Sequence, residues 1–175
     1  MTVTESGMQF GPFDQDDIFY WEKSKLFTTF GAGTKSVEFI CLDKENAFCL
    51  LEAKTTAPNP EGPKGQEGFD EYLEEISEKF IHTFDLFMAT WIKRYDDKDH
   101  EMPSNFLAQD IGKITIKFLL VIKESKELWL RPINDALNRI LLRYRKTWRI
   151  KVAVLNEDMA LSERLIYHSS EGVRL

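Results

Sequence analysis

Apolar positions divide the chain into segments with helical or strand spacing. Over residues 69–95 they recur every three or four positions, which predicts a long amphipathic helix. A second helix is expected from Pro132 to Trp148, because proline suits a first helical turn and the apolar spacing continues beyond it. Residues 14–33 begin with acids that can cap a helix and end in glycines, so they predict a helix that precedes both.

Four other segments have the composition of strands. Residues 36–43 and 47–54 are rich in aliphatic and aromatic residues, and only residues 44–46 separate them, so they predict a hairpin. Residues 113–123 alternate at first and then become continuously apolar, as in a strand that is covered on both faces. A last strand is expected at residues 149–155.

The order of these elements predicts the fold class. Early antiparallel strands followed by strand–helix–strand crossovers favour an α/β fold in which helices flank a mixed sheet. One more short strand is allowed, but the pattern does not place it. We expect residues 1–175 to form a single domain with its core at about residues 15–155.

Composition and charge narrow the function classes. No apolar run could span a membrane and residues 1–10 lack the features of a secretory signal, so we expect a cytoplasmic protein without a membrane partner. The net charge is −6, but residues 1–100 carry −10 (10 Lys and Arg, 20 Asp and Glu) and residues 101–175 carry +4 (13 and 9). The acidic total argues against indiscriminate binding of nucleic acid and leaves a local basic face open.

Residues 139–151 form the concentrated basic segment of the chain. Arg139, Arg143 and Lys146 fall opposite the apolar stripe of the helix predicted there. They are expected either to contact the phosphates of a nucleic acid or to form an ordinary solvated face.

The predicted hairpin aligns two acids. If residues 44–46 form its loop, the numbers of cross-strand partners sum to 90 and Glu38 lies opposite Glu52. Lys54 then shares their face of the sheet, because side chains alternate with a period of two. A loop of two or four residues would shift this pairing by one. The same register pairs two cysteines, which are expected to be buried and reduced, on the opposite face: Cys41 and Cys49.

This arrangement suits a divalent metal ion. Two opposed carboxylates repel each other, and a cation between them removes the repulsion. Mg²⁺ takes one or two protein carboxylates together with waters and a substrate phosphate, and Lys54 would reach such a water or phosphate. The alternative is that Glu52 and Lys54 form a surface ion pair at a strand end and that Glu38 is an edge-strand charge. Among the acid-x-Lys triplets of the chain, only the one at residues 52–54 ends an apolar strand and has an acid across from it.

The acid in one strand, the hairpin and "LLEAK" at the end of the next strand resemble the PD-(D/E)XK nuclease superfamily. The core of that family runs helix, three strands, helix, strand, which is compatible with roughly residues 15–155. The resemblance implies a restriction-endonuclease-like fold and a nuclease that depends on Mg²⁺ or Mn²⁺, with DNA as the favoured substrate. Small nucleases of this type often dimerise, so a homodimer is one expected assembly.

The resemblance also implies roles for individual residues. Glu38 and Glu52 would bind the metal together with the backbone carbonyl of Ala53, and Lys54 would orient or polarise the attacking water. Glu22 matches the position of an additional helix acid in many members of the family. Without such a role, Glu22 would be a solvated charge or the partner of a neighbouring lysine.

Two features depart from the family pattern. The upstream acid of the family is usually Asp, often after Pro, whereas Glu38 follows Val37. Gln66 and Tyr72 lie six residues apart, which is not the spacing of the Gln-and-Tyr motif that some branches carry. Many relatives keep the fold without catalysis, so the alternative function is an inactive module of this fold that binds nucleic acid or protein. An unrelated mixed α/β domain with a coincidental triplet is a third interpretation.

Overall fold

A five-stranded mixed sheet forms the centre of the protein, which a computed structural model describes at residues 1–30, 33–59, 61–62 and 65–167. The strands follow one another in space in chain order, and the second of them runs antiparallel to both of its neighbours. The last three run parallel, which confirms the predicted mixed sheet with an early antiparallel hairpin. In order the strands are β3 (Ile18–Phe19), β4 (Phe39–Leu42), β5 (Phe48–Lys54), β6 (Ile116–Ile122) and β7 (Lys151–Asn156).

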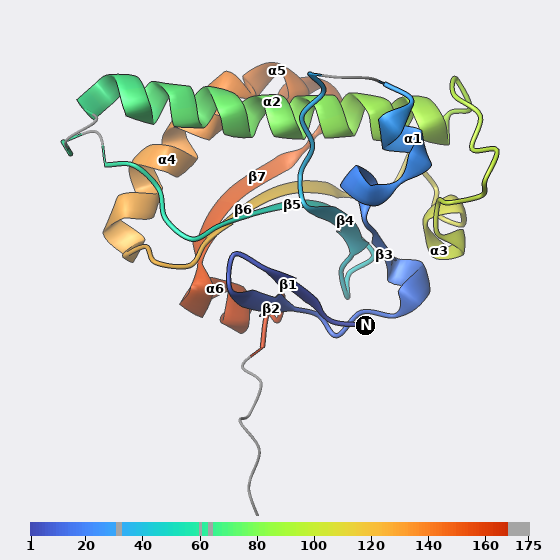
Figure 1. The fold of residues 1–175 in the computed structure, drawn as a ribbon, viewed down its shortest axis with the longest axis horizontal. Coiled ribbons are helices and arrows are strands. Elements are labelled where there is room, and N and C mark those ends of the chain that lie inside the picture. Colours follow the sequence, from blue (N-terminus) through green and yellow to red (C-terminus); the bar gives the residue numbers. More distant parts are fainter. Residues whose placement is uncertain (31–32, 60, 63–64, 168–175) are drawn as a thin grey trace, which may run out of the picture.

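Helices cover one face of this sheet and a small hairpin covers the other (Figure 1). The first face carries the long helix α2 (Gly65–Trp91), with α4 (Glu127–Ile140) and α5 (Leu142–Trp148) beside it. The second face carries the hairpin of β1 (Val3–Glu5) and β2 (Met8–Phe10), together with α6 (Glu157–Ser162). The remaining helical turns are η1 (Gln15–Asp17), η2 (Trp21–Lys23), α1 (Lys25–Thr28) and α3 (Ser104–Leu107).

The alternation of β5 divides the core into two layers. Phe48 and Leu50 point into the apolar layer beneath the helices, whereas Cys49 and Leu51 point into the layer above the hairpin. Because both faces are covered, the strand is apolar almost throughout. The even-numbered residues that follow, Glu52 among them, therefore point at α2.

The predicted helix at residues 14–33 is wrong, and its final residues 31–32 lie outside the described part of the chain. The segment instead forms short helical turns around β3, in which Ile18 pairs with Cys41 of β4. Trp21 has no exposed surface and packs edge-to-face against Phe87 of α2. The aromatic side chains of this segment are stabilised more by burial at the edge of the sheet than they would be in a solvent-exposed helix. The unplaced short strand is therefore β3.

The helix predicted from Pro132 begins earlier, at the first residue of α4, Glu127. Proline removes only the bond that its N–H would donate to the carbonyl of Leu128, and Leu128 is 85% exposed, so water can reach this turn. The helix is interrupted at Leu141, where α5 starts in a new direction. The apolar stripe is consequently split, and Trp148 is exposed at its end.

The β1–β2 hairpin is absent from the sequence-based prediction. Each strand has three residues, which is too short for a periodic signal, and the turn between them holds Ser6 and Gly7 at positive φ. No helix among the described residues combines the length and the apolar character needed to cross a bilayer.

A buried backbone contact fixes the approach to β4, and we expect its removal to destabilise the protein. The N–H of Val37 donates to Oγ1 of Thr83 on α2 at 3.0 Å. Thr83→Val leaves this donor buried and unpaired, which costs about 1–3 kcal/mol of unfolding free energy, measured by denaturant titration. Thr90→Val is the control, because Oγ1 of Thr90 only donates to a carbonyl of its own helix. Equal losses in the two variants would contradict this role of Thr83.

Candidate active site

The register of the β4–β5 hairpin matches the sequence-based prediction. Phe39 pairs with Leu51, so cross-strand partners sum to 90, and the N–H of Asp43 donates to the carbonyl of Ala47 at 3.0 Å. The three-residue loop is therefore confirmed. Glu38 immediately precedes β4 and lies outside the paired residues: its N–H donates to the carbonyl of Leu51 at 3.1 Å, so the predicted pairing of Glu38 with Glu52 is not part of the ladder.

Glu52 is buried rather than placed at a solvated strand end. Its side chain has no exposed surface, which excludes the surface ion pair considered for it. Its Oε1 accepts from Nζ of Lys79 at 2.6 Å and lies 3.3 Å from Nζ of Lys54. Its Oε2 is buried and has no hydrogen-bond partner among the described residues.

Helix α2 supplies further residues of the group around Glu52, which we call the carboxylate cluster: Tyr72, Glu75 and Lys79. Glu75 accepts from Nζ of Lys54 at 3.1 Å, so Lys54 bridges a buried and a half-exposed carboxylate. Tyr72, one turn earlier, has a buried hydroxyl that finds no hydrogen-bond partner in the part of the chain that the structure describes. Burial and the negative charges of Glu52 and Glu75 raise the pKa of Tyr72. The hydroxyl therefore stays protonated and can donate toward an anion in this cluster.

The charges of the cluster are set by burial and pairing together. Loss of hydration raises the pKa of Glu52, and the ammonium groups of Lys79 and Lys54 oppose that shift. Burial would lower the pKa of Lys54, but the charge of Glu52 and the hydrogen bond to Glu75 raise it overall. Lys54 is thus a firmly protonated cation that touches the buried carboxylate.

Glu38 is a partly buried carboxyl group in negative surroundings. Burial first, and then the charge of Glu52, raise its pKa from 4.5 to about 7. Glu5 and Glu22 add to this effect, and Lys79 opposes it. The charge of Glu52 thus reaches the carboxyl of Glu38, and the two like charges repel each other.

The carbonyl of Ala53 lies on the same side of β5 as Glu38. The carbonyl of Leu51 accepts from the N–H of Glu38 at 3.1 Å, and alternate residues of a strand direct their carbonyls to the same side. The carbonyl of Ala53 accepts from Oγ of Ser6, in the turn of the β1–β2 hairpin, at 3.0 Å. The hairpin thus closes one side of the cluster.

The oxygen atoms of this cluster fit a hard divalent cation. An orphaned Oε2 of buried Glu52, an opposed carboxyl at Glu38 and the carbonyl of Ala53 are the ligand types that Mg²⁺ prefers. Among the described residues no group of three or more His, Cys, Asp or Glu side chains is arranged as a metal site. A metal here would therefore rely on two carboxylates and one carbonyl, with water and substrate completing its coordination.

The remaining predicted residues lie farther from this cluster. Glu22 is exposed in η2, not in a long helix, and neither neighbouring lysine pairs with it: Lys25 binds Asp99, and Lys23 lies over the ring of Tyr20. Its charge still reaches Glu38.

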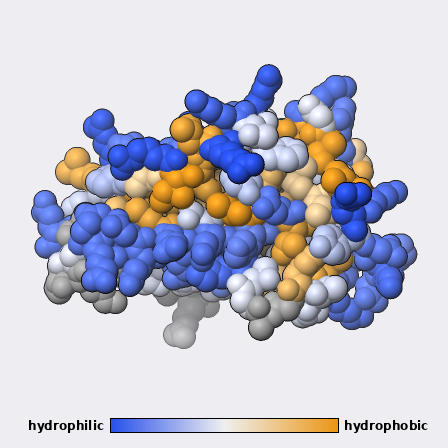
Figure 2. Space-filling model, turned by 90° about the horizontal axis from the view of Figure 1, so that it is seen from above, coloured by the Kyte–Doolittle hydropathy of each residue, from blue (hydrophilic) through white to orange (hydrophobic). Residues whose placement is uncertain are grey.

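The three basic residues predicted to bind nucleic acid are exposed on α4 and α5, which pack beside α2 on the helical face. Figure 2 shows that this face interleaves hydrophilic side chains with hydrophobic ones. No contact joins Arg139, Arg143 or Lys146 to the carboxylate cluster. They would meet a substrate that extends across the helices.

Sequence reasoning missed the contributions of α2 and of the hairpin. Glu75 and Lys79 are one turn apart on a helix whose other edge carries the predicted apolar stripe. Four-residue spacing placed them on one face, but nothing local showed that this face meets β5. Ser6 and Glu5 had no signal, because their hairpin was not predicted.

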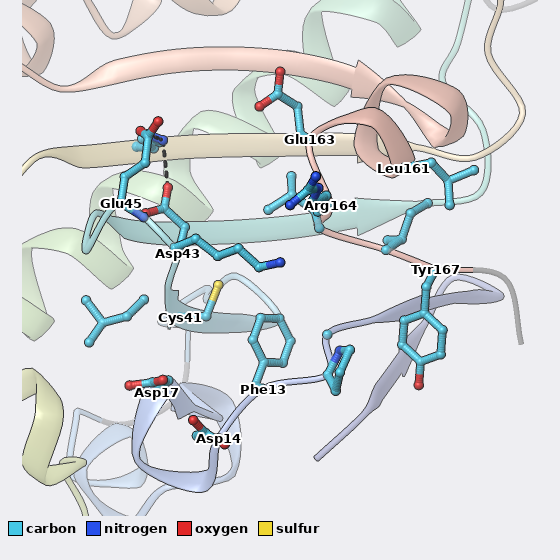
Figure 3. Close-up of a pocket in the computed structure, with 17 residues that line it drawn as sticks. Phe13, Asp14, Asp17, Cys41, Asp43, Glu45, Leu161, Glu163, Arg164 and Tyr167 are labelled. Carbon is cyan, nitrogen blue, oxygen red and sulfur yellow. Dashed lines mark hydrogen bonds and ion pairs between the residues drawn. The ribbon is translucent and has the colours of Figure 1, made fainter.

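Five cavities lined by the described residues lie away from this cluster. One of about 580 Å³ lies at the β4–β5 turn beside the C-terminal segment, with Cys41, Asp43 and Arg164 in its wall (Figure 3). Its Lys117 is already paired with Asp43 at 2.6 Å and with Glu45 at 3.2 Å. None of the five cavities found includes a residue of the carboxylate cluster.

Comparison of the chain with protein-family models, with curated proteins and with solved structures finds no match.

The raised pKa of Glu38 predicts an unusual dependence of stability on pH. Between about pH 4.5 and 7 the folded protein binds more protons than the unfolded chain, so Glu38 lowers stability as pH rises through this window. Glu38→Gln should therefore raise the Tm relative to the wild type at pH 8, and the gain should shrink at pH 5. Thermal unfolding measures this, with Glu71→Gln on the exposed face of α2 as the control. A gain that is independent of pH would contradict the assignment.

Proposed function

We propose that the protein is a Mg²⁺- or Mn²⁺-dependent nuclease that hydrolyses phosphodiester bonds, with DNA as the favoured substrate. One observation carries the proposal: the carboxylate of Glu52 is buried in contact with the ammonium of Lys54, and its charge reaches the carboxyl of Glu38 just before β4. This is the constellation implied by the resemblance to PD-(D/E)XK nucleases. The order of three strands, helix, strand from β3 to β6 is compatible with the same family core, whereas short helical turns stand where that core begins with a helix.

The residues of the cluster have distinct roles in this proposal. Glu38, Glu52 and the carbonyl of Ala53 would hold the divalent ion, which supplies Lewis-acid stabilisation of the phosphate and lowers the pKa of a bound water. Lys54 orients the attacking water, because its ammonium is fixed between Glu52 and Glu75 and is 27% exposed. Tyr72 offers a protonated hydroxyl that can donate to a phosphate oxygen.

The pKa of Glu38 has a direct consequence for metal binding. A carboxyl that is half protonated near pH 7 must lose its proton before it can bind a cation. Metal affinity should therefore increase from pH 6 to pH 8.

A second candidate is an inactive module of the same fold that binds nucleic acid or a protein. The observation that favours it is the pairing of Glu52 with Lys79 at 2.6 Å, because an ammonium already compensates the buried carboxylate. Such a module would not respond to divalent ions, whereas the nuclease would.

Hydrolysis of DNA in the presence of Mg²⁺ or Mn²⁺ tests the proposal. We expect Lys54→Ala to lower the cleavage rate at least about a hundredfold, because the attacking water loses its orienting cation. Lys126→Ala is the matched control, since Lys126 ends another acid-x-Lys triplet but is exposed and outside the cluster. The same cleavage assay with RNA shows whether the protein acts on DNA, on RNA or on both.

Equal cleavage by the wild type and Lys54→Ala would remove the assigned mechanism. Absence of both cleavage and any metal-induced rise in the Tm of the wild type would favour the inactive module. A Tm rise that is lost in Glu52→Gln would show that the ion binds at this carboxylate.

The exposed cations of α4 and α5 are expected to contact the phosphates of the substrate. Replacing Arg139, Arg143 and Lys146 together by Ala should weaken DNA binding and reduce its salt dependence by about one unit of logarithmic slope per lost contact. Fluorescence anisotropy at several salt concentrations measures both quantities. The control replaces three exposed lysines outside these helices: Lys44, Lys98 and Lys113. An unchanged salt slope would assign the three cations to an ordinary solvated surface.

A further inference from the structure

Two lysines contact the buried carboxylate of Glu52, and they are not equivalent. Lys54 lies 3.3 Å from Oε1 of Glu52 and shares its charge with Glu75. Lys79 lies closer, at 2.6 Å, and Glu52 is the only acid with which it forms an ion pair among the described residues. The strongest pairing of the catalytic carboxylate is therefore with a residue that the triplet does not contain.

Contacts of α2 one turn beyond Lys79 bring the chain before β4 close to this lysine. The chain that leads into β4 runs along α2, where the N–H of Lys35 donates to Nδ1 of His82 at 3.2 Å and that of Val37 donates to Thr83. Lys79 precedes Thr83 by one helical turn on the same face, so it lies next to the residue that follows Val37. That residue is Glu38.

The charge of Lys79 acts on both carboxyls. It forms an ion pair with the carboxylate of Glu52, and it also opposes the rise in the pKa of Glu38. Its side chain is 19% exposed, so the pairing takes place largely out of water. The ammonium of Lys79 thus occupies a contact with Glu52 that a divalent ion bound to this carboxylate would compete for.

We propose that Lys79 is the resident counter-ion of the metal-free site and that a divalent ion binds by displacing its ammonium from Glu52. The inference rests on the proposed function and adds a residue that controls metal affinity. Before the metal binds, Lys79 keeps the buried carboxylate ionised and paired. Once displaced from Glu52, the ammonium of Lys79 would be available to contact a substrate phosphate.

Metal affinity measured without substrate tests the competition. Isothermal titration with Mn²⁺ and with Mg²⁺ compares the wild type with Lys79→Met, which keeps the length of the side chain and removes its charge. We expect Lys79→Met to bind Mn²⁺ about tenfold more tightly or better, because no ammonium competes for Glu52 and none repels the ion. Lys54→Met is the matched control, and its gain should be smaller because Lys54 is divided between two acids.

Chemical labelling of the wild type gives a second readout that does not depend on the folding of a variant. Lysine acylation followed by mass spectrometry should show faster modification of Lys79 at saturating Mn²⁺, since the displaced ammonium becomes accessible. Lys117 is the internal control: its side chain is 21% exposed and is paired with Asp43, far from the site. Its labelling should not change.

The outcomes separate this inference from the proposed function. Equal Mn²⁺ affinity in the wild type and Lys79→Met, or unchanged labelling of Lys79 at saturating Mn²⁺, overturns the inference and leaves the metal site standing. Binding by Lys79→Met but not by the wild type supports the inference even if the wild type cleaves nothing. If neither protein binds Mn²⁺, the counter-ion role and the proposed function both fail.

Discussion

The burial of Glu52 is the constraint on which the site depends. Removing a carboxylate from water costs several kcal/mol unless cations and hydrogen bonds compensate it. Here the compensation comes from another element, since Lys79 of α2 donates to a strand residue 27 positions away in the chain. The sheet and the long helix are therefore held in one relative position by an interaction that also creates the candidate site.

This coupling explains why the cluster is assembled from so many segments. The chain before β4 brings one acid, β5 brings another acid and a base, and α2 brings a base, an acid and a tyrosine. Each contact that orders the site is also a packing contact, as the Val37–Thr83 hydrogen bond illustrates. A substitution that alters the site in such an arrangement also alters the stability of the fold, because the same residues hold the helix on the sheet.

The sequence predicted the part of this arrangement that depends on short-range periodicity. The three-residue loop fixes the register of β4 and β5, so the pairing of residues 39–42 with residues 48–51 followed from counting residues. The α2 helix followed from its long apolar stripe, which begins four residues after the helix itself. In both cases one local pattern determines one structure.

The rest depended on contacts between distant segments. Residues 14–28 have acids that can also cap a helix, and only their pairing with β4 turns part of them into β3. Lys79 has the sequence environment of any solvated helix lysine, and its role appears only when α2 lies over β5. The three-residue strands of the N-terminal hairpin depend on Ser6 reaching Ala53, a contact across 47 positions of the chain.

The regular spacing of side chains along helix α2 matches the positions of their partners in and before the strands. Glu75, Lys79 and Thr83 are spaced by four residues, and each one meets a different point of the strand layer: Lys54, Glu52 and Val37. One residue inserted between positions 75 and 83 would turn everything beyond it by about 100° and carry these side chains away from their partners. The spacing along this helix should consequently be held fixed wherever the site is retained.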